Sequence, residues 1–79
     1  MTSSNPSHSS EAVQLTKREV EILSLIIEGY SSKKVAEMLF ISKRTVDFHL
    51  DNIYQKLSVT NRMQAINQAR RLGLLPVSV

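Results

Sequence analysis

The chain of 79 residues is long enough for one small domain, and its hydrophobic fraction of 42% and charged fraction of 22% are ordinary for a globular protein. It has no cysteine, which excludes disulfides and thiolate metal sites, and no apolar run near the roughly 20 residues of a membrane span. The formal net charge of +3 favours an acidic partner such as nucleic acid, and we expect a cytoplasmic domain with no membrane, metal, cofactor or small-molecule ligand.

The first fourteen residues differ in composition from the rest of the chain. The stretch MTSSNPSHSSEAVQ contains five serines and a proline and offers little apolar surface. We therefore expect residues 1–14 to be a disordered tail or linker. A folded domain is expected over residues 15–75, followed by a flexible carboxyl terminus at residues 76–79.

A complete helix-start signal opens the segment LTKREVEILSLIIEGY. Thr16 is the expected N-cap, and Glu19, three residues later, completes a capping box. Gly29 provides the left-handed residue that ends a helix, so the first helix is expected over about 17–28. The apolar residues that recur on one face of it are Val20, Ile22, Leu23, Ile26 and Ile27.

A short helix and a long helix follow, joined by a tight turn over residues 39–42. The segment SSKKVAEMLF predicts the short helix, capped by Ser31 or Ser32. Ser42 is the expected N-cap of the long helix, which covers about 43–57. Its buried stripe is predicted to be Val46, Leu50, Ile53 and Leu57, and its outward face Arg44, Asp47, Phe48, Asp51, Asn52 and Gln55.

The last helix begins near Thr60 or Asn61 and ends at Gly73. One of its stripes consists of Ala65, Ala69 and Leu72, and a second stripe, which points elsewhere, consists of Met63, Ile66, Asn67 and Arg70. No segment alternates polar and apolar residues, so we predict an all-α fold, a four-helix bundle that contains a helix-turn-helix.

The middle pair of helices has the pattern of a DNA-binding helix-turn-helix, whose second helix presents its amino-terminal residues to base edges in the major groove. Hydroxyl and basic side chains at that end also suit phosphates, because the helix dipole is positive there. From spacing and charge alone, a bundle whose outward cations are merely solvated is an equal alternative. The candidate DNA-binding residues are Ser32, Lys33, Lys34, Ser42, Lys43, Arg44, Thr45, Asp47, Phe48, Asp51 and Lys56.

A series of short motifs runs in order along the predicted domain: Leu15-Thr16-x-Arg18-Glu19, Gly29-x-Ser31, Ala36-x-x-Leu39, Ile41-Ser42-x-x-Thr45-Val46-x-x-His49, Asn52-Ile53-x-x-Lys56-Leu57, Arg62 and Gly73-Leu74. On these motifs the chain resembles the LuxR/FixJ-type helix-turn-helix domain, a carboxyl-terminal effector domain of bacterial response regulators. The resemblance implies sequence-specific binding of duplex DNA in transcription regulation, a recognition helix at 43–57 and a homodimer formed through the last helix. RNA polymerase is a further candidate partner.

The second stripe of the last helix has two alternative uses. It can pack against a second copy in a two-fold contact, with dimerisation residues Met63, Ile66, Asn67 and Arg70. Such a dimer binds a symmetric site whose half-sites lie about one helical turn apart. In the alternative, Met63 and Ile66 pack on the amino-terminal tail or on the first helix.

Two acidic residues depart from the family pattern, in which lysine often follows the Thr-Val pair and a second basic residue follows one turn later. Those positions are Asp47 and Asp51. In one interpretation, one of them accepts a hydrogen bond from cytosine N4, a contact worth about 1–3 kcal/mol of discrimination. In the other, they are solvated or pair with Lys43 and Gln55 on the same helix. The rival function is a protein-interaction module whose acidic face no longer binds DNA.

Two adjacent ring side chains lie in the middle of the same long helix. Phe48, on the outward face, can contact a thymine methyl group or be an incidental exposed aromatic. His49 lies beside the buried stripe, and we expect it to be packed and hydrogen-bonded rather than a metal ligand. The other histidine, His8, lies in the tail, and no cysteine is available for a zinc site.

Overall fold

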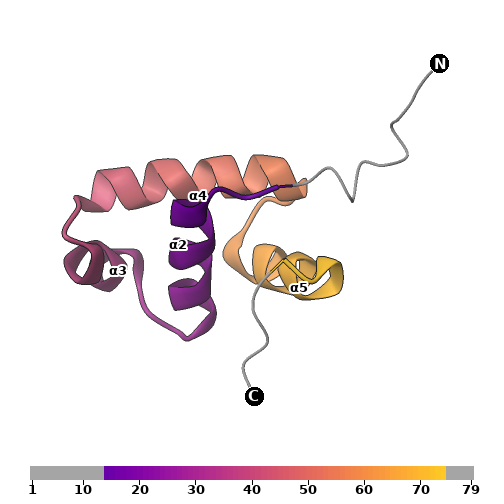
Figure 1. Ribbon diagram of the computed structural model, residues 1–79, viewed down its shortest axis with the longest axis horizontal. Helices are drawn as coiled ribbons and strands as arrows, with labels where there is room; N and C mark the ends of the chain where they lie inside the picture. Colours follow the sequence, from indigo (N-terminus) through magenta and orange to yellow (C-terminus); the bar gives the residue numbers. More distant parts are fainter. Residues whose placement is uncertain (1–13, 75–79) are drawn as a thin grey trace.

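Residues 14–74 are described by the computed structural model, and within them the chain forms four helices and no strand (Figure 1). The helices are α2 (Lys17–Ile27), α3 (Ser32–Leu39), α4 (Lys43–Leu57) and α5 (Arg62–Leu72). The predicted all-α class is confirmed, with the helices in the predicted order. Residues 1–13 of the predicted tail, and the predicted flexible terminus at 76–79, lie outside the described residues. No helix within residues 14–74 is both long and apolar enough to cross a bilayer.

Each helix begins at a polar side chain that caps its first turn. The Thr16 hydroxyl accepts the Glu19 N–H at 3.1 Å, and the Glu19 carboxylate accepts the Thr16 N–H at 2.9 Å, so the predicted capping box is present. The other helices are capped in a similar way, by Ser31, Ser42 and Asn61. Since one such cap contributes about 1 kcal/mol, these local sequences explain where the four helices start.

The four helices also end alike, in a residue with positive φ. After α2 this residue is Gly29, with φ of 105°, and after α5 it is Gly73, with φ of 65°. At α3 and α4 the position is taken by Phe40 and Ser58, with φ of 59° and 58°. A side chain in this left-handed region costs about 1–3 kcal/mol, so the turn between α3 and α4 contains a strained residue.

Replacing Phe40 by glycine is expected to raise the free energy of unfolding by about 1 kcal/mol. The Phe40 side chain is 93% exposed, so its loss takes almost nothing from the core, whereas glycine relieves the left-handed backbone. Urea unfolding followed by circular dichroism measures the change. Phe40→Ala removes the ring but keeps the strain, and is the control expected to stay at the wild-type midpoint. A destabilised glycine variant would contradict the interpretation.

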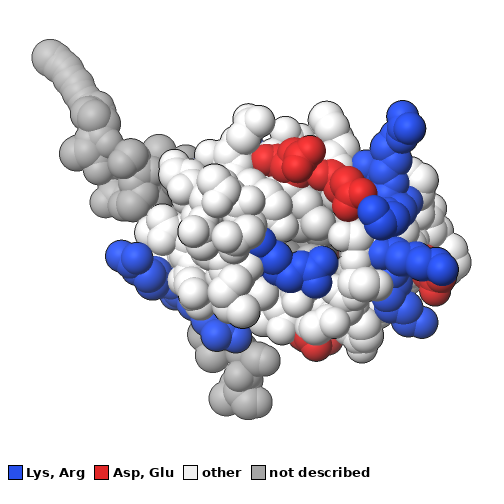
Figure 2. All heavy atoms as spheres, turned by 180° about the vertical axis from the view of Figure 1, so that it is seen from behind, with Lys and Arg blue, Asp and Glu red and all other residues white. Residues whose placement is uncertain are grey.

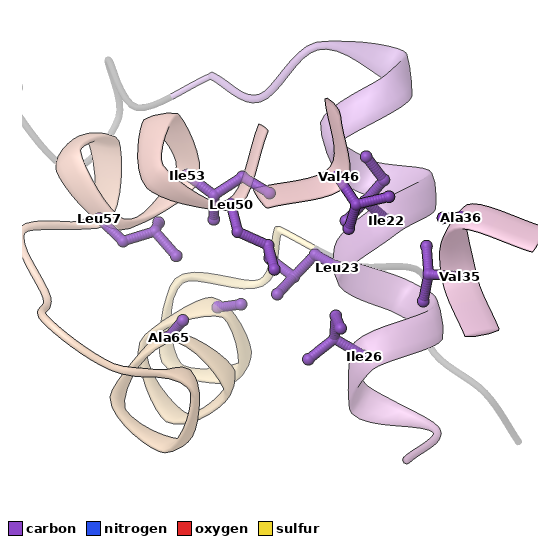
Figure 3. Packing of buried hydrophobic residues seen from close by; sticks show 11 residues of the cluster. Ile22, Leu23, Ile26, Val35, Ala36, Val46, Leu50, Ile53, Leu57 and Ala65 are labelled. Carbon is purple, nitrogen blue, oxygen red and sulfur yellow. The ribbon is translucent and has the colours of Figure 1, made fainter. Parts of the chain in front are cut away.

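The core lies between α4 and the other three helices. In Figure 1, α4 runs across one side of the molecule, with α2 standing against it and α3 and α5 to either side of α2. The predicted α4 stripe is buried at all four positions, with exposed fractions of 5% or less, at Val46, Leu50, Ile53 and Leu57. Figure 3 shows Leu50 and Leu57 of this stripe pointing toward Leu23 and Ala65, and Val46 lying beside Ile22 of α2. The opposite face of α4 is therefore turned outward.

Candidate nucleic-acid interface

The predicted helix-turn-helix is formed by α3 and α4, which are joined by three residues, 40–42. Val35 and Ala36 on α3 are buried in the same cluster as the α4 stripe, so packing fixes the two helices relative to each other. The 15 residues of α4 span about 22 Å, enough to lie along a major groove about 12 Å wide.

Two hydroxyl groups lie at the amino terminus of α4. The Ser42 hydroxyl accepts the N–H of Thr45 at 3.0 Å, and the two side-chain oxygens are 2.9 Å apart. Ser42 is exposed and Thr45 half-buried. Both predicted residues are thus at the positive end of the helix dipole, where phosphate oxygens are favoured.

Four exposed cations surround this end of α4, and we call them the basic cluster: Lys33, Lys34, Lys43 and Arg44. The first two belong to the first turn of α3 and the others to the first turn of α4. Figure 2 shows Lys and Arg gathered at the end of the molecule formed by α3 and the start of α4, with acidic side chains directly beside them. The cluster therefore presents positive charge to any polyanion that meets α4.

The first of the two unusual carboxylates is paired. The Lys43 ammonium donates to Asp47 Oδ2 at 2.8 Å, and the side chains are 60% and 46% exposed. This hydrogen bond lowers the pKa of Asp47 below its ordinary value of 3.8, and the Ser32 hydroxyl on α3 adds a smaller effect in the same direction. The alternative in which Asp47 pairs with Lys43 is therefore the arrangement of the free domain. Asp51, one turn further along α4, is exposed.

Two adjacent rings of α4, those of Phe48 and His49, contact each other at its surface. Phe48 is 61% exposed and meets His49 edge-on, with ring centroids 5.8 Å apart and planes inclined at 64°. His49 is half-buried beside the core stripe, as its spacing predicted, but within residues 14–74 its ring contacts Phe48 and makes no hydrogen bond. Phe48 thus offers an apolar surface within the polar outward face.

Lys56 lies in the last turn of α4, away from the basic cluster. Its ammonium donates to Glu19 Oε1 at 2.7 Å, although 37 residues separate the two along the chain. The Glu19 residue is only 3% exposed. Burial raises the pKa of Glu19, but the hydrogen bonds from Lys56 and from Thr16 together lower it by more than burial raises it. The pKa of Glu19 therefore lies below its ordinary value of 4.5. Lys56 therefore has a structural partner that the spacing of residues in the sequence did not reveal.

The proposed dimerisation stripe lies on the surface of α5. Met63 is 65% exposed, and Asn67 and Arg70 are exposed as well. Ile66 is half-buried and packs against the core cluster. The stripe therefore divides into an inner residue, which helps to hold α5, and outer residues available to a second copy.

Comparisons with known proteins agree with this arrangement. A family model described as GerE, bacterial regulatory proteins of the luxR family, matches residues 13–69. The transcriptional regulatory protein DegU of Brevibacillus brevis is 43% identical over 63 residues, which are 80% of this chain and 27% of DegU. The HTH-type transcriptional regulator MalT of Yersinia pestis is 45% identical over 58 residues, which are 73% of this chain and 6% of MalT. The chain thus spans only a small part of these relatives.

Solved structures of two similar proteins share the fold. The transcription factor GerE superposes with a TM-score of 0.74 at 47% identity, covering 78% of this chain and 92% of that one. The response regulator ChrA of a heme-sensing two-component system gives a TM-score of 0.76 at 48% identity, covering 77% of this chain and 30% of ChrA.

Proposed function

Because the chain belongs to the luxR family of bacterial regulatory proteins, and is a DNA-binding helix-turn-helix domain of transcription regulation, we propose that it recognises a specific duplex sequence in the cytoplasm with α4 in the major groove. The observation that carries this proposal is the exposed outward face of α4, bordered at its amino end by the basic cluster. Positive charge beside an exposed helix is what phosphate-driven docking requires.

The residues of the interface divide by role. Lys33 and Lys34 contact the phosphate backbone from the start of α3, and the hydroxyls at 42–45 contact phosphates or base edges. Phe48 packs against a thymine methyl group, and Asp51 accepts from a base amino group. We assign Lys56 to the fold rather than to DNA, because its ammonium is engaged with the buried Glu19.

Selection from randomised duplexes at low salt, followed by sequencing, tests the proposal. Three to four phosphate contacts by the basic cluster predict a slope of log affinity against log salt of about −2.7 to −3.6 per domain. Enrichment of one site with such a slope is the expected result. If no duplex is retained at about 50 mM salt, the acidic face has abolished DNA binding, and the rival protein-interaction function takes its place.

We also propose that two copies pair through the outer residues of the α5 stripe on a symmetric site. Met63→Ala is expected to weaken binding to that site about tenfold, because a two-fold contact contains the residue twice, and to leave binding to a single half-site unchanged. Met38→Ala, a methionine on α3 outside the stripe, is the control. Sedimentation with and without duplex gives the stoichiometry, and one copy per symmetric site would count against the dimer.

A further inference from the structure

The outward face of α4 carries balanced charge. Its cations Lys43 and Arg44 are matched by two carboxylates on the next two turns, Asp47 and Asp51. A helix that binds phosphates without discrimination gains from unopposed positive charge. This helix has almost none. The attraction of the domain for DNA of arbitrary sequence must therefore come largely from Lys33 and Arg44, because Lys34 on α3 lies 3.8 Å from the carboxylate of Glu37.

One of these charges is already neutralised within the domain. The Lys43 ammonium lies 2.8 Å from Asp47 Oδ2, and the two residues stand one turn apart on the same face. The Ser32 hydroxyl at the start of α3 reinforces the ionised carboxylate. Lys43 and Asp47 therefore hold each other on the outward face of α4.

We propose that Lys43 and Asp47 form a latch that is closed in the free domain and opens on a G·C base pair, where guanine accepts from Lys43 and cytosine N4 donates to Asp47. The inference rests on the proposed function and adds to it the chemistry of the recognised base pair. On unselected DNA, Lys43 gains a phosphate only by leaving Asp47 unpaired beside the backbone, where its charge is repelled. On a G·C pair both side chains exchange their partners at once.

The geometry suits this exchange. Side chains four residues apart on a helix have Cβ atoms about 5–6 Å apart. Two such side chains can therefore reach the edges of the same base pair, or of two adjacent base pairs, which are stacked about 3.4 Å apart. Guanine presents two acceptors, N7 and O6, beside the cytosine amino group, whereas an A·T pair places an apolar methyl group at the pyrimidine edge. Because both side chains are about half exposed, the closed pair is weak enough to open.

A double-mutant cycle tests the latch. Lys43→Met, Asp47→Asn and the double variant are compared with the wild type for binding to a random duplex pool, with circular dichroism to verify folding. Asp47→Asn is expected to raise affinity for the pool about fivefold and to steepen the salt slope by about 0.9. Lys43→Met should have little effect in the wild-type background, but should lower affinity about fivefold in the Asp47→Asn background. The matched control, Asp51→Asn, should show no such coupling with Lys43→Met.

The same variants are then used for selection from randomised duplexes. Asp47→Asn is expected to reduce the preference for G·C at one position of each half-site at least about fivefold, leaving the other positions unchanged. Equal effects of Lys43→Met in both backgrounds, or an unchanged site preference, would overturn the latch while leaving DNA binding intact. Failure of the wild type and all variants to retain any duplex would instead overturn the proposed function, and the latch with it.

Discussion

Replacing Ile53 by alanine is expected to lower the free energy of unfolding by about 2–5 kcal/mol. Ile53 is fully buried on the face of α4 that packs against α2 and α5 (Figure 3). A domain of about 60 residues has a total stability of only about 3–9 kcal/mol, so this one change leaves little or none. DNA binding should be lost together with the fold, because the cavity lies directly beneath the outward face of α4.

Urea unfolding followed by circular dichroism measures this loss. Ile27→Ala removes the same atoms from a half-buried site at the end of α2, and is expected to cost about half as much. Excess duplex should raise the urea midpoint of Ile53→Ala, since DNA binds only the folded state. A smaller loss at Ile53 than at Ile27 would mean that the α4 stripe is not the centre of the core.

The parts of the fold predicted correctly from sequence depend on short-range signals. The capping box at Thr16 and Glu19 is a pattern of four residues, and the α4 stripe is a spacing within one helix. Both are determined by residues close together in the sequence, so they do not depend on contacts with the rest of the molecule. The position of the helix-turn-helix follows from the same signals, because the caps at Ser31 and Ser42 fix where both of its helices start.

The features that sequence reasoning missed depend on contacts between helices. Glu19 was expected only to cap α2, but α4 brings Lys56 to it from 37 residues away. The left-handed backbone of Phe40 was also unforeseen, since no glycine marks that turn and the packing of α3 on α4 imposes it. For Asp47, spacing allowed both a base contact and a pair with Lys43, and the folded structure shows the pair with Lys43 in the free domain.

The contact between Lys56 and Glu19 leads to the second large effect. Lys56→Met is expected to lower the free energy of unfolding at neutral pH by about 2 kcal/mol, since it leaves a buried carboxylate without its counter-ion. Loss of one partner of a fully buried pair costs about 3–5 kcal/mol, and the smaller figure allows for Lys56 being 36% exposed. The Thr16 N–H still donates to the carboxylate, so the capping box should persist.

The pH dependence separates this role from a general loss of charge. The pKa of Glu19 in the folded wild type lies below 4.5, so the stability from its ionised form is present above about pH 4.5 and is lost as pH falls through the folded pKa. In Lys56→Met the main lowering contact is gone, burial raises the pKa of Glu19, and acidification should cost less stability. The two proteins should therefore converge in stability as the pH falls from 7 to about 3.

Urea midpoints at several pH values measure this convergence, with Lys33→Met as a control that removes an exposed lysine of α3. The control should stay parallel to the wild type at every pH.

The same pair of variants also separates the two assignments of Lys56. If Lys56 serves the fold, its substitution lowers stability even without DNA, and binding weakens only as far as folding does. If instead stability is unchanged, DNA affinity falls, and the slope of log affinity against log salt becomes shallower by about 0.9, the value for one phosphate contact, Lys56 belongs to the interface.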